Sequence, residues 1–316
     1  MSVRQALVRV FHLLALHGEL AKVRLSSLVV ITAGSGYILA RGFDAPTTLF
    51  WTLAGTFLAA AGAMALNEAW EVDRDRRMRR TATRPLVTGT LPLWYGWFFG
   101  IASSGFGVWL LAAKSHRLAA LLGATVVALY VLAYTPMKAK TPFCTLVGAV
   151  CGAIPPLMGW SAATGRLEGG AWLLAALLFF WQIPHFLSLA WLYRDDYRRG
   201  GFRMLPEMDP EGRLTGRLSL MYALATVASA LSLALARVAG PYFTAGAILL
   251  GAALVLLAWG LAVRPSEANA RSLFRATLVY LPLVVALAAL DRGVVGDPAR
   301  VAASLPGGSS SISLRD

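Results

Sequence analysis

The chain has 316 residues, of which 57% are hydrophobic and only 14% are charged. A soluble domain usually carries about 25% charged residues, so this composition excludes an ordinary soluble protein. The formal net charge of +13 does not indicate a nucleic-acid partner, because Lys and Arg lie in short segments between apolar runs and form no basic domain. The two cysteines, Cys144 and Cys151, are too few for a metal cluster, and we expect them to pack as small apolar side chains.

Residues 1–23 contain Arg4 and Arg9 but only a weak apolar stretch that histidines interrupt. This pattern fits neither a cleaved signal peptide nor an Arg- and Ser-rich organellar presequence. We therefore expect a cytoplasmic N-terminal segment ahead of the first membrane span.

Apolar runs long enough to cross a bilayer recur along the rest of the chain. A helix of about 20 residues crosses a hydrocarbon core about 30 Å thick, and lipid requires each span to satisfy its own backbone hydrogen bonds. The runs lack the alternation of barrel strands. We therefore predict an all-α polytopic bundle of nine transmembrane helices within residues 24–293. The expected spans are Arg24–Leu39, Thr47–Trp70, Leu91–Ala113, Leu118–Tyr134, Phe143–Ala163, Ala171–Tyr193, Leu218–Ala236, Tyr242–Val263 and Leu273–Leu290.

The basic residues indicate which ends of the spans face the cytoplasm. With a cytoplasmic N-terminus, 21 of the 29 Lys and Arg residues fall in the inside segments, as the positive-inside rule requires. The prediction is a multi-pass protein of the bacterial cytoplasmic (inner) membrane with its C-terminus outside. Residues 294–316 include a Gly-Gly-Ser-Ser-Ser run and are predicted to be a disordered tail.

Nine of the 16 acidic residues gather in two groups at the expected cytoplasmic face, and the first group comprises Glu68, Glu71, Asp73 and Asp75. In the first group, Asn67, Glu71 and Asp75 are four residues apart and stack on one helix face, with Glu68 beside them. Such oxygen ligands suit Mg²⁺, which usually combines a few carboxylates with water and phosphate oxygens. Arginines, whose guanidinium groups match phosphate, surround the column at Arg74, Arg76, Arg77, Arg79, Arg80 and Arg84.

An alternative is a solvated loop with ion pairs between residues i and i+4. We favour a functional site, because Asn67 and Glu68 continue an otherwise apolar helix, and ionisable residues at membrane depth are costly and usually functional. Carboxylates for a metal and arginines for an anion are what the ionisation of a diphosphate requires.

The second acidic group begins with Asp195 and Asp196 and continues through Glu207, Asp209 and Glu211. Adjacent residues on a helix point about 100° apart, so both aspartates can reach one metal ion only near a helix end. We predict a second metal position here, and a cluster of loop ion pairs is the alternative.

Several basic and aromatic residues near the same face remain ambiguous. Lys22, Lys138 and Lys140 could reach a diphosphate, or they could be ordinary snorkelling anchors. Trp181, Gln182 and His185 share a helical face and, with Tyr134, are candidates to line an acceptor pocket. A packed, hydrogen-bonded histidine is an equally good interpretation of His185.

At these residues the chain resembles the UbiA superfamily of membrane-bound aromatic prenyltransferases. The superfamily pattern Asn-Asp-x-x-Asp-x-x-x-Asp corresponds to residues 67–75 here, with Glu at two of the Asp positions. Within the superfamily, residues 73–86, 134–160 and 181–206 are most similar to the branch that farnesylates heme. The chain lacks a second Asp-x-x-x-Asp motif, which counts against a quinone-type enzyme.

The resemblance implies transfer of a farnesyl group from farnesyl diphosphate to a vinyl group of heme B, with water addition, to give heme O and diphosphate. It implies that Asn67, Glu71, Asp75, Asp195 and Asp196 are catalytic and, together with Glu68, hold Mg²⁺. The implied diphosphate ligands are Arg80, Arg84, Lys138, Lys140 and Lys22. Heme would be a substrate, and a downstream enzyme that forms heme A is a candidate partner.

Two rival functions remain. One is a prenyltransferase that acts on a quinone precursor or another aromatic acceptor. The other is a heme transporter or assembly factor without enzymatic activity. A transporter more often has broken helices and polar ligands at the middle of the membrane, whereas the polar clusters here are expected at one interface.

Overall fold

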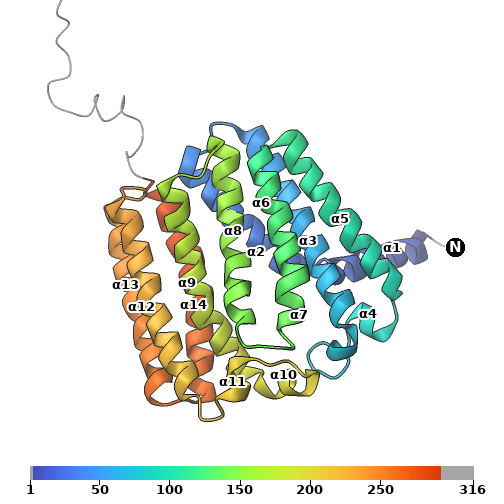
Figure 1. The fold of residues 1–316 in the computed structure, drawn as a ribbon. Helices are drawn as coiled ribbons and strands as arrows, with labels where there is room; N and C mark the ends of the chain where they lie inside the picture. The colour runs from blue at the N-terminus through green and yellow to red at the C-terminus, as the bar shows by residue number, and fades with distance from the viewer. Residues whose placement is uncertain (1–2, 293–316) are drawn as a thin grey trace, which may run out of the picture.

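The computed structural model describes residues 3–292, and within them it contains only helices (Figure 1). Nine helical segments in this part of the chain are long and apolar enough to cross a membrane. They are α2 (Val23–Arg41), α3 (Pro46–Asp75), α5 (Leu93–Lys114), α6–η1–α7 (Arg117–Met137), α8 (Cys144–Thr164), α9 (Gly169–Leu192), α12 (Arg213–Leu235), α13 (Pro241–Val263) and α14 (Glu267–Leu290). The predicted all-α bundle with nine spans is therefore confirmed, and each expected span overlaps one of these helices. The predicted tail, residues 294–316, lies outside the described residues.

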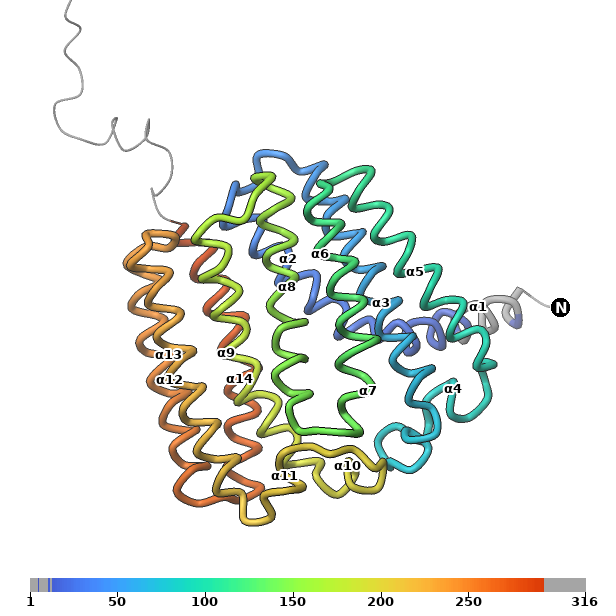
Figure 2. The backbone as a smooth tube through the Cα atoms, in the orientation of Figure 1, coloured from blue at the N-terminus to red at the C-terminus, as the bar shows by residue number. Residues whose placement is uncertain are grey.

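Four shorter helices flank the spans. They are α1 (Val3–Leu20), α4 (Pro85–Thr88), α10 (Arg194–Gly200) and α11 (Leu205–Met208). Figure 2 shows α1 lying across the direction of the spanning helices. The C-terminal residue of α1, Leu20, is buried in a cluster with Ala65, Ala69, Leu86 and Leu91. The segment expected only as a cytoplasmic N-terminal extension thus includes a helix anchored on α3 and α4.

The spans are arranged around α8. In its apolar stretch 78% of the residues are buried within the bundle, the largest share among the described spans. Helix α2 packs on α8, α3 packs on α5, and α12 packs on both α9 and α13. Figure 1 shows α12 and α13 at one side of the bundle and α5 at the other.

Small residues allow two of these helix pairs to approach closely. A Cβ atom added at Gly159 of α8 would lie 1.7 Å from the carbonyl oxygen of Ala33 on α2, and one at Gly36 would lie 2.0 Å from that of Pro156. Gly62 of α3 faces Gly100 of α5 in the same way. Lipid tails are as apolar as the helices, so close van der Waals packing of this kind supplies much of the helix association.

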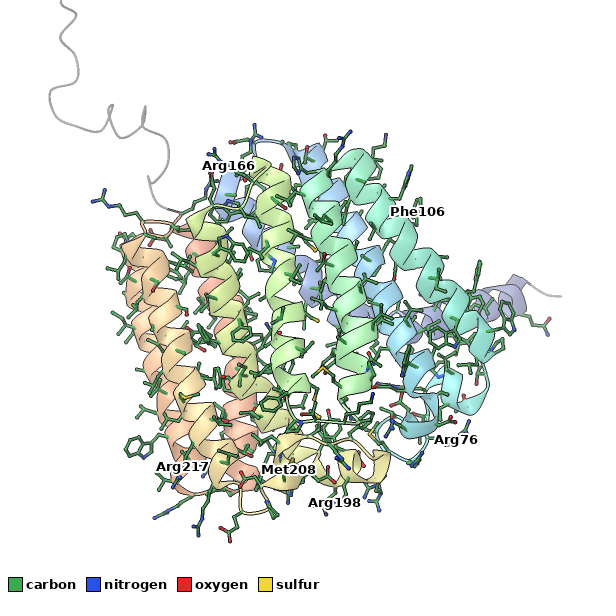
Figure 3. All side chains as sticks on the ribbon, in the orientation of Figure 1. Arg76, Phe106, Arg166, Arg198, Met208 and Arg217 are labelled. Carbon is green, nitrogen blue, oxygen red and sulfur yellow. The ribbon has the colours of Figure 1, made fainter. Side chains whose placement is uncertain are left out.

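The end of α3 and the segment around α10 lie at one end of the bundle. Helix α3 has 30 residues, and at 1.5 Å per residue it is about 45 Å long, longer than a hydrocarbon core of about 30 Å. Its last turns therefore extend past the apolar layer, toward the segment that carries α10 and α11 (Figure 1). Arg76 and Arg198 lie at this end and Arg166 lies at the opposite end (Figure 3). Both acidic groups are thus at the same end of the bundle.

Candidate active site

The first acidic group forms a buried column on the last turns of α3. Asn67, Glu68, Glu71 and Asp75 are only 3%, 2%, 4% and 1% exposed. The spacing of four residues places Asn67, Glu71 and Asp75 on one face, as predicted. Burial of three carboxyl groups is costly unless each is paired, so their partners decide what the site can do.

Each of the three carboxylates faces a basic side chain. The Nζ atom of Lys138 lies 2.6 Å from Glu71, and Arg84 forms a short ion pair with Asp75. Glu68 Oε1 lies 3.4 Å from the Nζ atom of Lys22 and 3.6 Å from the Nε atom of Arg84. The structure therefore interleaves three carboxylates with three of the predicted diphosphate ligands.

The three cations come from three separate parts of the chain. Lys22 precedes α2 in a left-handed conformation with φ of 44°, which is uncommon for a residue with a Cβ atom. Arg84 is the residue before Pro85 at the start of α4, and Lys138 follows α7. Burial, reinforced by the charge of Arg84, lowers the pKa of Lys22 to about 8.

The fourth crossing segment contains a π-helical stretch, η1 (Leu129–Tyr134), between α6 and α7 (Thr135–Met137). Such stretches are rare and frequently occur at functional sites. Directly after η1, the hydroxyl oxygen of Thr135 accepts a hydrogen bond of 3.1 Å from Nδ2 of Asn67. Thr135 was not among the site residues predicted from the sequence. The only local signal was the following Pro136, which lacks an N–H group and disturbs a regular helix.

The second acidic group separates into buried and exposed members. Asp196 is 9% exposed, pairs with Arg199 and accepts a hydrogen bond of 3.4 Å from the main-chain N–H of Arg79. Burial acts to raise the pKa of Asp196, but the hydrogen bond and charge of Arg199 and the main-chain hydrogen bonds from Arg79 and Arg80 together outweigh it, and the pKa lies below its usual value. Asp195 is exposed and lies 3.5 Å from Arg198. The structure thus distinguishes two neighbouring aspartates that the sequence treated alike.

Two further acids of the second group, Asp209 and Glu211, make contacts near the start of α12. Asp209 Oδ2 accepts a hydrogen bond of 2.6 Å from the main-chain N–H of Thr215 near the start of α12. Glu211 pairs with Arg213 at 2.8 Å. These contacts are local to the segment that leads into α12.

Arginines connect the two acidic groups. The guanidinium carbon of Arg80 lies 4.9 Å from the ring centre of Tyr193 and 5.9 Å from that of Tyr197. Nη1 of Arg74 donates to the carbonyl oxygens of Gly200 and Gly201 at 3.2 and 2.7 Å. The loop after α3 and the segment around α10 therefore form one contiguous surface.

The predicted acceptor residues point in different directions. Trp181 Nε1 donates to the carbonyl of Thr277 at 3.0 Å, and Nδ1 of His185 lies 2.9 Å from the Thr277 hydroxyl. Gln182 instead donates to the carbonyl of Ala149 on α8 at 3.4 Å. Trp181 and His185 are therefore together against α14, whereas Gln182 faces α8.

Two predicted residues lie at the edge of these groups. Tyr134 lies beside the carboxylate column, because its ring centre is 5.1 Å from Nζ of Lys138. Lys140 is exposed, and none of the ion pairs within residues 3–292 includes it. The structure brings Lys138, but not Lys140, into the carboxylate column.

The donor atoms of the column suit a hard cation. Within residues 3–292 no three His, Cys, Asp or Glu side chains gather closely enough to hold a metal ion, and each carboxylate of the column faces a basic residue. The oxygen ligands nevertheless fit Mg²⁺ in type, and Oε2 of Glu68 is buried without a hydrogen-bond partner. Metal ligation by Glu71 and Asp75 would require them to exchange Lys138 and Arg84 for the ion.

Comparison with known proteins identifies relatives of the whole domain. Residues 28–279 match the UbiA prenyltransferase family. The chain is 40% identical over 289 residues to the protoheme IX farnesyltransferase of Koribacter versatilis, covering 88% of this chain and 93% of the relative. It is 44% identical over 265 residues to the protoheme IX farnesyltransferase of Anaeromyxobacter sp., covering 84% of this chain and 89% of the relative.

A solved structure supports the same fold. The UbiA homologue of Archaeoglobus fulgidus bound to GPP and Mg²⁺ superposes with a TM-score of 0.63, covering 86% of this chain and 99% of that chain. The sequence identity is 13%, so this likeness concerns the fold alone. That homologue binds a divalent ion together with a prenyl diphosphate.

Proposed function

Because the chain belongs to the UbiA prenyltransferase family, we propose that it transfers a farnesyl group from farnesyl diphosphate to a vinyl group of heme B. Addition of water completes the reaction, and the products are heme O and diphosphate. The observation that carries this proposal is the identity of 40% to a protoheme IX farnesyltransferase across 88% of the chain. The buried column of carboxylates and cations supports it, since it combines metal ligands with anion ligands.

Mg²⁺ is the proposed ion, held by Asn67, Glu71 and Asp75 with Glu68 beside them. When bound, Mg²⁺ supplies positive charge that neutralises the departing diphosphate. The second acidic group is the proposed second metal position. Asp196, which is buried and linked to the loop after α3, is better placed for this role than the exposed Asp195.

The cations of the column bind the donor. Lys22, Arg84 and Lys138 pair with the carboxylates when no donor is bound, and they turn onto the diphosphate oxygens when the donor enters. Arg80 is exposed, and its planar guanidinium group adds hydrogen-bond donors that suit phosphate. This exchange of partners keeps every buried charge compensated before and after donor binding.

The chemical step breaks the bond between C1 of the farnesyl group and the diphosphate oxygen, and its electron pair leaves with the diphosphate. The π electrons of the heme vinyl group then form the new carbon–carbon bond to C1. Water adds to the vinyl carbon next to the ring and releases a proton. The apolar helices hold the farnesyl chain and exclude other water. Trp181, His185, Gln182 and Tyr134 are the proposed acceptor contacts.

The proposed setting is the inner membrane of a bacterium, with the column facing the cytoplasm. The distribution of basic residues supports this orientation. Heme O is the expected substrate of an enzyme that forms heme A, and such an enzyme is the proposed downstream partner.

The test is to incubate the purified protein in detergent with heme B, farnesyl diphosphate and Mg²⁺ and to follow the porphyrin by mass spectrometry. We expect a product heavier by one farnesyl group and one hydroxyl group, absent after chelation and absent with Asp75→Asn. If heme stays unmodified but diphosphate is released when a phenolic acceptor is supplied, the enzyme is a prenyltransferase whose acceptor is another aromatic compound. No reaction with any acceptor by folded protein would favour a transporter or assembly factor.

A further inference from the structure

The amide of Asn67 is held on both sides by groups with opposite hydrogen-bonding character. Its Nδ2 atom donates to the hydroxyl oxygen of Thr135 at 3.1 Å. Its Oδ1 atom accepts from Nζ of Lys22 at 3.4 Å. Asn67 and Thr135 are 3% and 2% exposed, so the amide has few other partners.

The Thr135 hydroxyl can accept from Asn67 because its own proton is already committed. That hydroxyl donates to the carbonyl oxygen of Tyr130 at 2.8 Å. A hydroxyl has one proton, so its oxygen is left to act only as an acceptor. An ammonium group such as that of Lys22 has donors and no acceptor. Both neighbours therefore require the same orientation of the amide, with nitrogen toward Thr135 and oxygen toward the cation side of the column.

The π-helical stretch η1 supplies the partner for this hydroxyl. The main-chain N–H of Thr135 also donates to the Tyr130 carbonyl, five residues back rather than four. That register brings the Tyr130 carbonyl within reach of the Thr135 hydroxyl. A local feature of the fourth span thereby fixes a side chain on α3.

From this geometry we infer that Thr135 is a positioning residue that fixes the Asn67 amide with its oxygen toward the metal and diphosphate site. The inference rests on the proposed function for the identity of that site. A reversed amide would present N–H groups to a bound cation and would turn N–H groups, in place of the Asn67 oxygen, toward the ammonium of Lys22. Removing a residue that orients a metal ligand typically changes metal affinity by about 10-fold to 100-fold.

The test measures binding of Mn²⁺, a spin-active substitute for Mg²⁺, by electron paramagnetic resonance of detergent-solubilised full-length protein with inorganic pyrophosphate. No turnover and no heme are needed. We expect Thr135→Val to raise the Kd for Mn²⁺ by about 10-fold or more, and Thr135→Ser, which keeps the hydroxyl, to stay within about twofold of wild type. Thr135→Ala serves in the same way if the Val variant does not fold in a thermal unfolding assay.

Two controls separate orientation from general packing. Thr226→Val in α12 removes a buried threonine hydroxyl whose hydrogen bond among the described residues goes to the helix carbonyl of Tyr222, at 2.7 Å, and we expect no change in Kd. In an Asn67→Asp background a carboxylate presents oxygen either way, so Thr135→Val should change the Kd by less than about twofold.

Several results would overturn the inference. An equal loss of Mn²⁺ affinity on Thr135→Val in the wild-type and Asn67→Asp backgrounds would mean that Thr135 only supports packing. An unchanged Kd in Thr135→Val and Thr135→Ala would mean that the hydroxyl does not orient the amide. If the wild-type protein does not bind Mn²⁺, the column is not a metal site and Thr135 cannot orient a metal ligand. Intact Mn²⁺ binding with no farnesylation of heme B would instead contradict the proposed function alone.

Discussion

Nζ of Lys138 lies 2.6 Å from Oε2 of Glu71, joining the end of the fourth span to the carboxylate column of α3. The two side chains are only 11% and 5% exposed. Removing one member of a buried ion pair leaves an uncompensated charge and typically costs about 3–5 kcal/mol. A metal ion bound to Glu71 would compensate that charge in place of Lys138.

The first prediction concerns Lys138→Met. We expect the variant to unfold at lower temperature than wild type without metal, and Mn²⁺ alone to raise its melting temperature more than it raises that of wild type. Pyrophosphate affinity in the presence of Mn²⁺ should fall by about 10-fold or more, since a charged hydrogen bond contributes about 1.5–3 kcal/mol. Thermal unfolding and pyrophosphate titration measure both effects.

Lys140→Met is the matched control, because Lys140 is exposed and lies two residues further along. We expect smaller changes in both measurements. Equal losses of pyrophosphate affinity in the two variants would contradict the assignment of Lys138 to the column.

The second prediction separates Asp195 from Asp196. Asp195 belongs to an exposed ion pair, and such pairs usually contribute less than about 1 kcal/mol, so Asp195→Asn should reduce farnesyl transfer by less than about fivefold. Asp196 is buried and holds both Arg199 and the backbone of Arg79. We expect Asp196→Asn to reduce transfer by at least about 10-fold. Initial rates at saturating heme B and farnesyl diphosphate provide the comparison, and a reversed order would be evidence against the placement of these two residues.

The third prediction concerns the acceptor. His185 stacks between the rings of Trp181 and Phe274, with ring centres 5.2 and 5.0 Å away. His185→Phe keeps an aromatic ring there and removes the hydrogen bond to Thr277. If His185 contacts heme, the KM for heme B should rise by about twofold to 10-fold, the range expected for about 0.5–1.5 kcal/mol, while pyrophosphate affinity stays unchanged. Parallel losses of both would indicate a packing role for His185.

Much of the bundle was predictable because membrane spans depend on local composition. The apolar runs located nine helices, and the four-residue spacing of Asn67, Glu71 and Asp75 located the column on α3. Both signals are periodic within one segment, so they need no knowledge of tertiary contacts.

The contacts between segments were not predictable in the same way. The pairing of Lys138 with Glu71 and the hydrogen bond between Thr135 and Asn67 depend on how the fourth span packs against α3. The side chains of Trp181 and Gln182 point to different helices because adjacent helical residues are about 100° apart. Helical spacing alone did not identify which helix each side chain contacts.

The last prediction tests the close approach of α8 to α2, the helix that follows Lys22. A Cβ atom at Gly159 would lie 1.7 Å from the carbonyl oxygen of Ala33, and a backbone oxygen cannot move aside as a flexible side chain can. We expect Gly159→Ala to separate the helices and to cost at least about 1–3 kcal/mol, as overpacking does. Gly260→Ala is the control, because nothing lies within 4 Å of its added Cβ atom and helix propensity favours Ala by about 0.5–1 kcal/mol.

Thermal unfolding followed by size-exclusion chromatography in detergent should show a lower melting temperature for Gly159→Ala and an unchanged or higher one for Gly260→Ala. Equal melting temperatures for the two variants would mean that α2 and α8 are not in close contact.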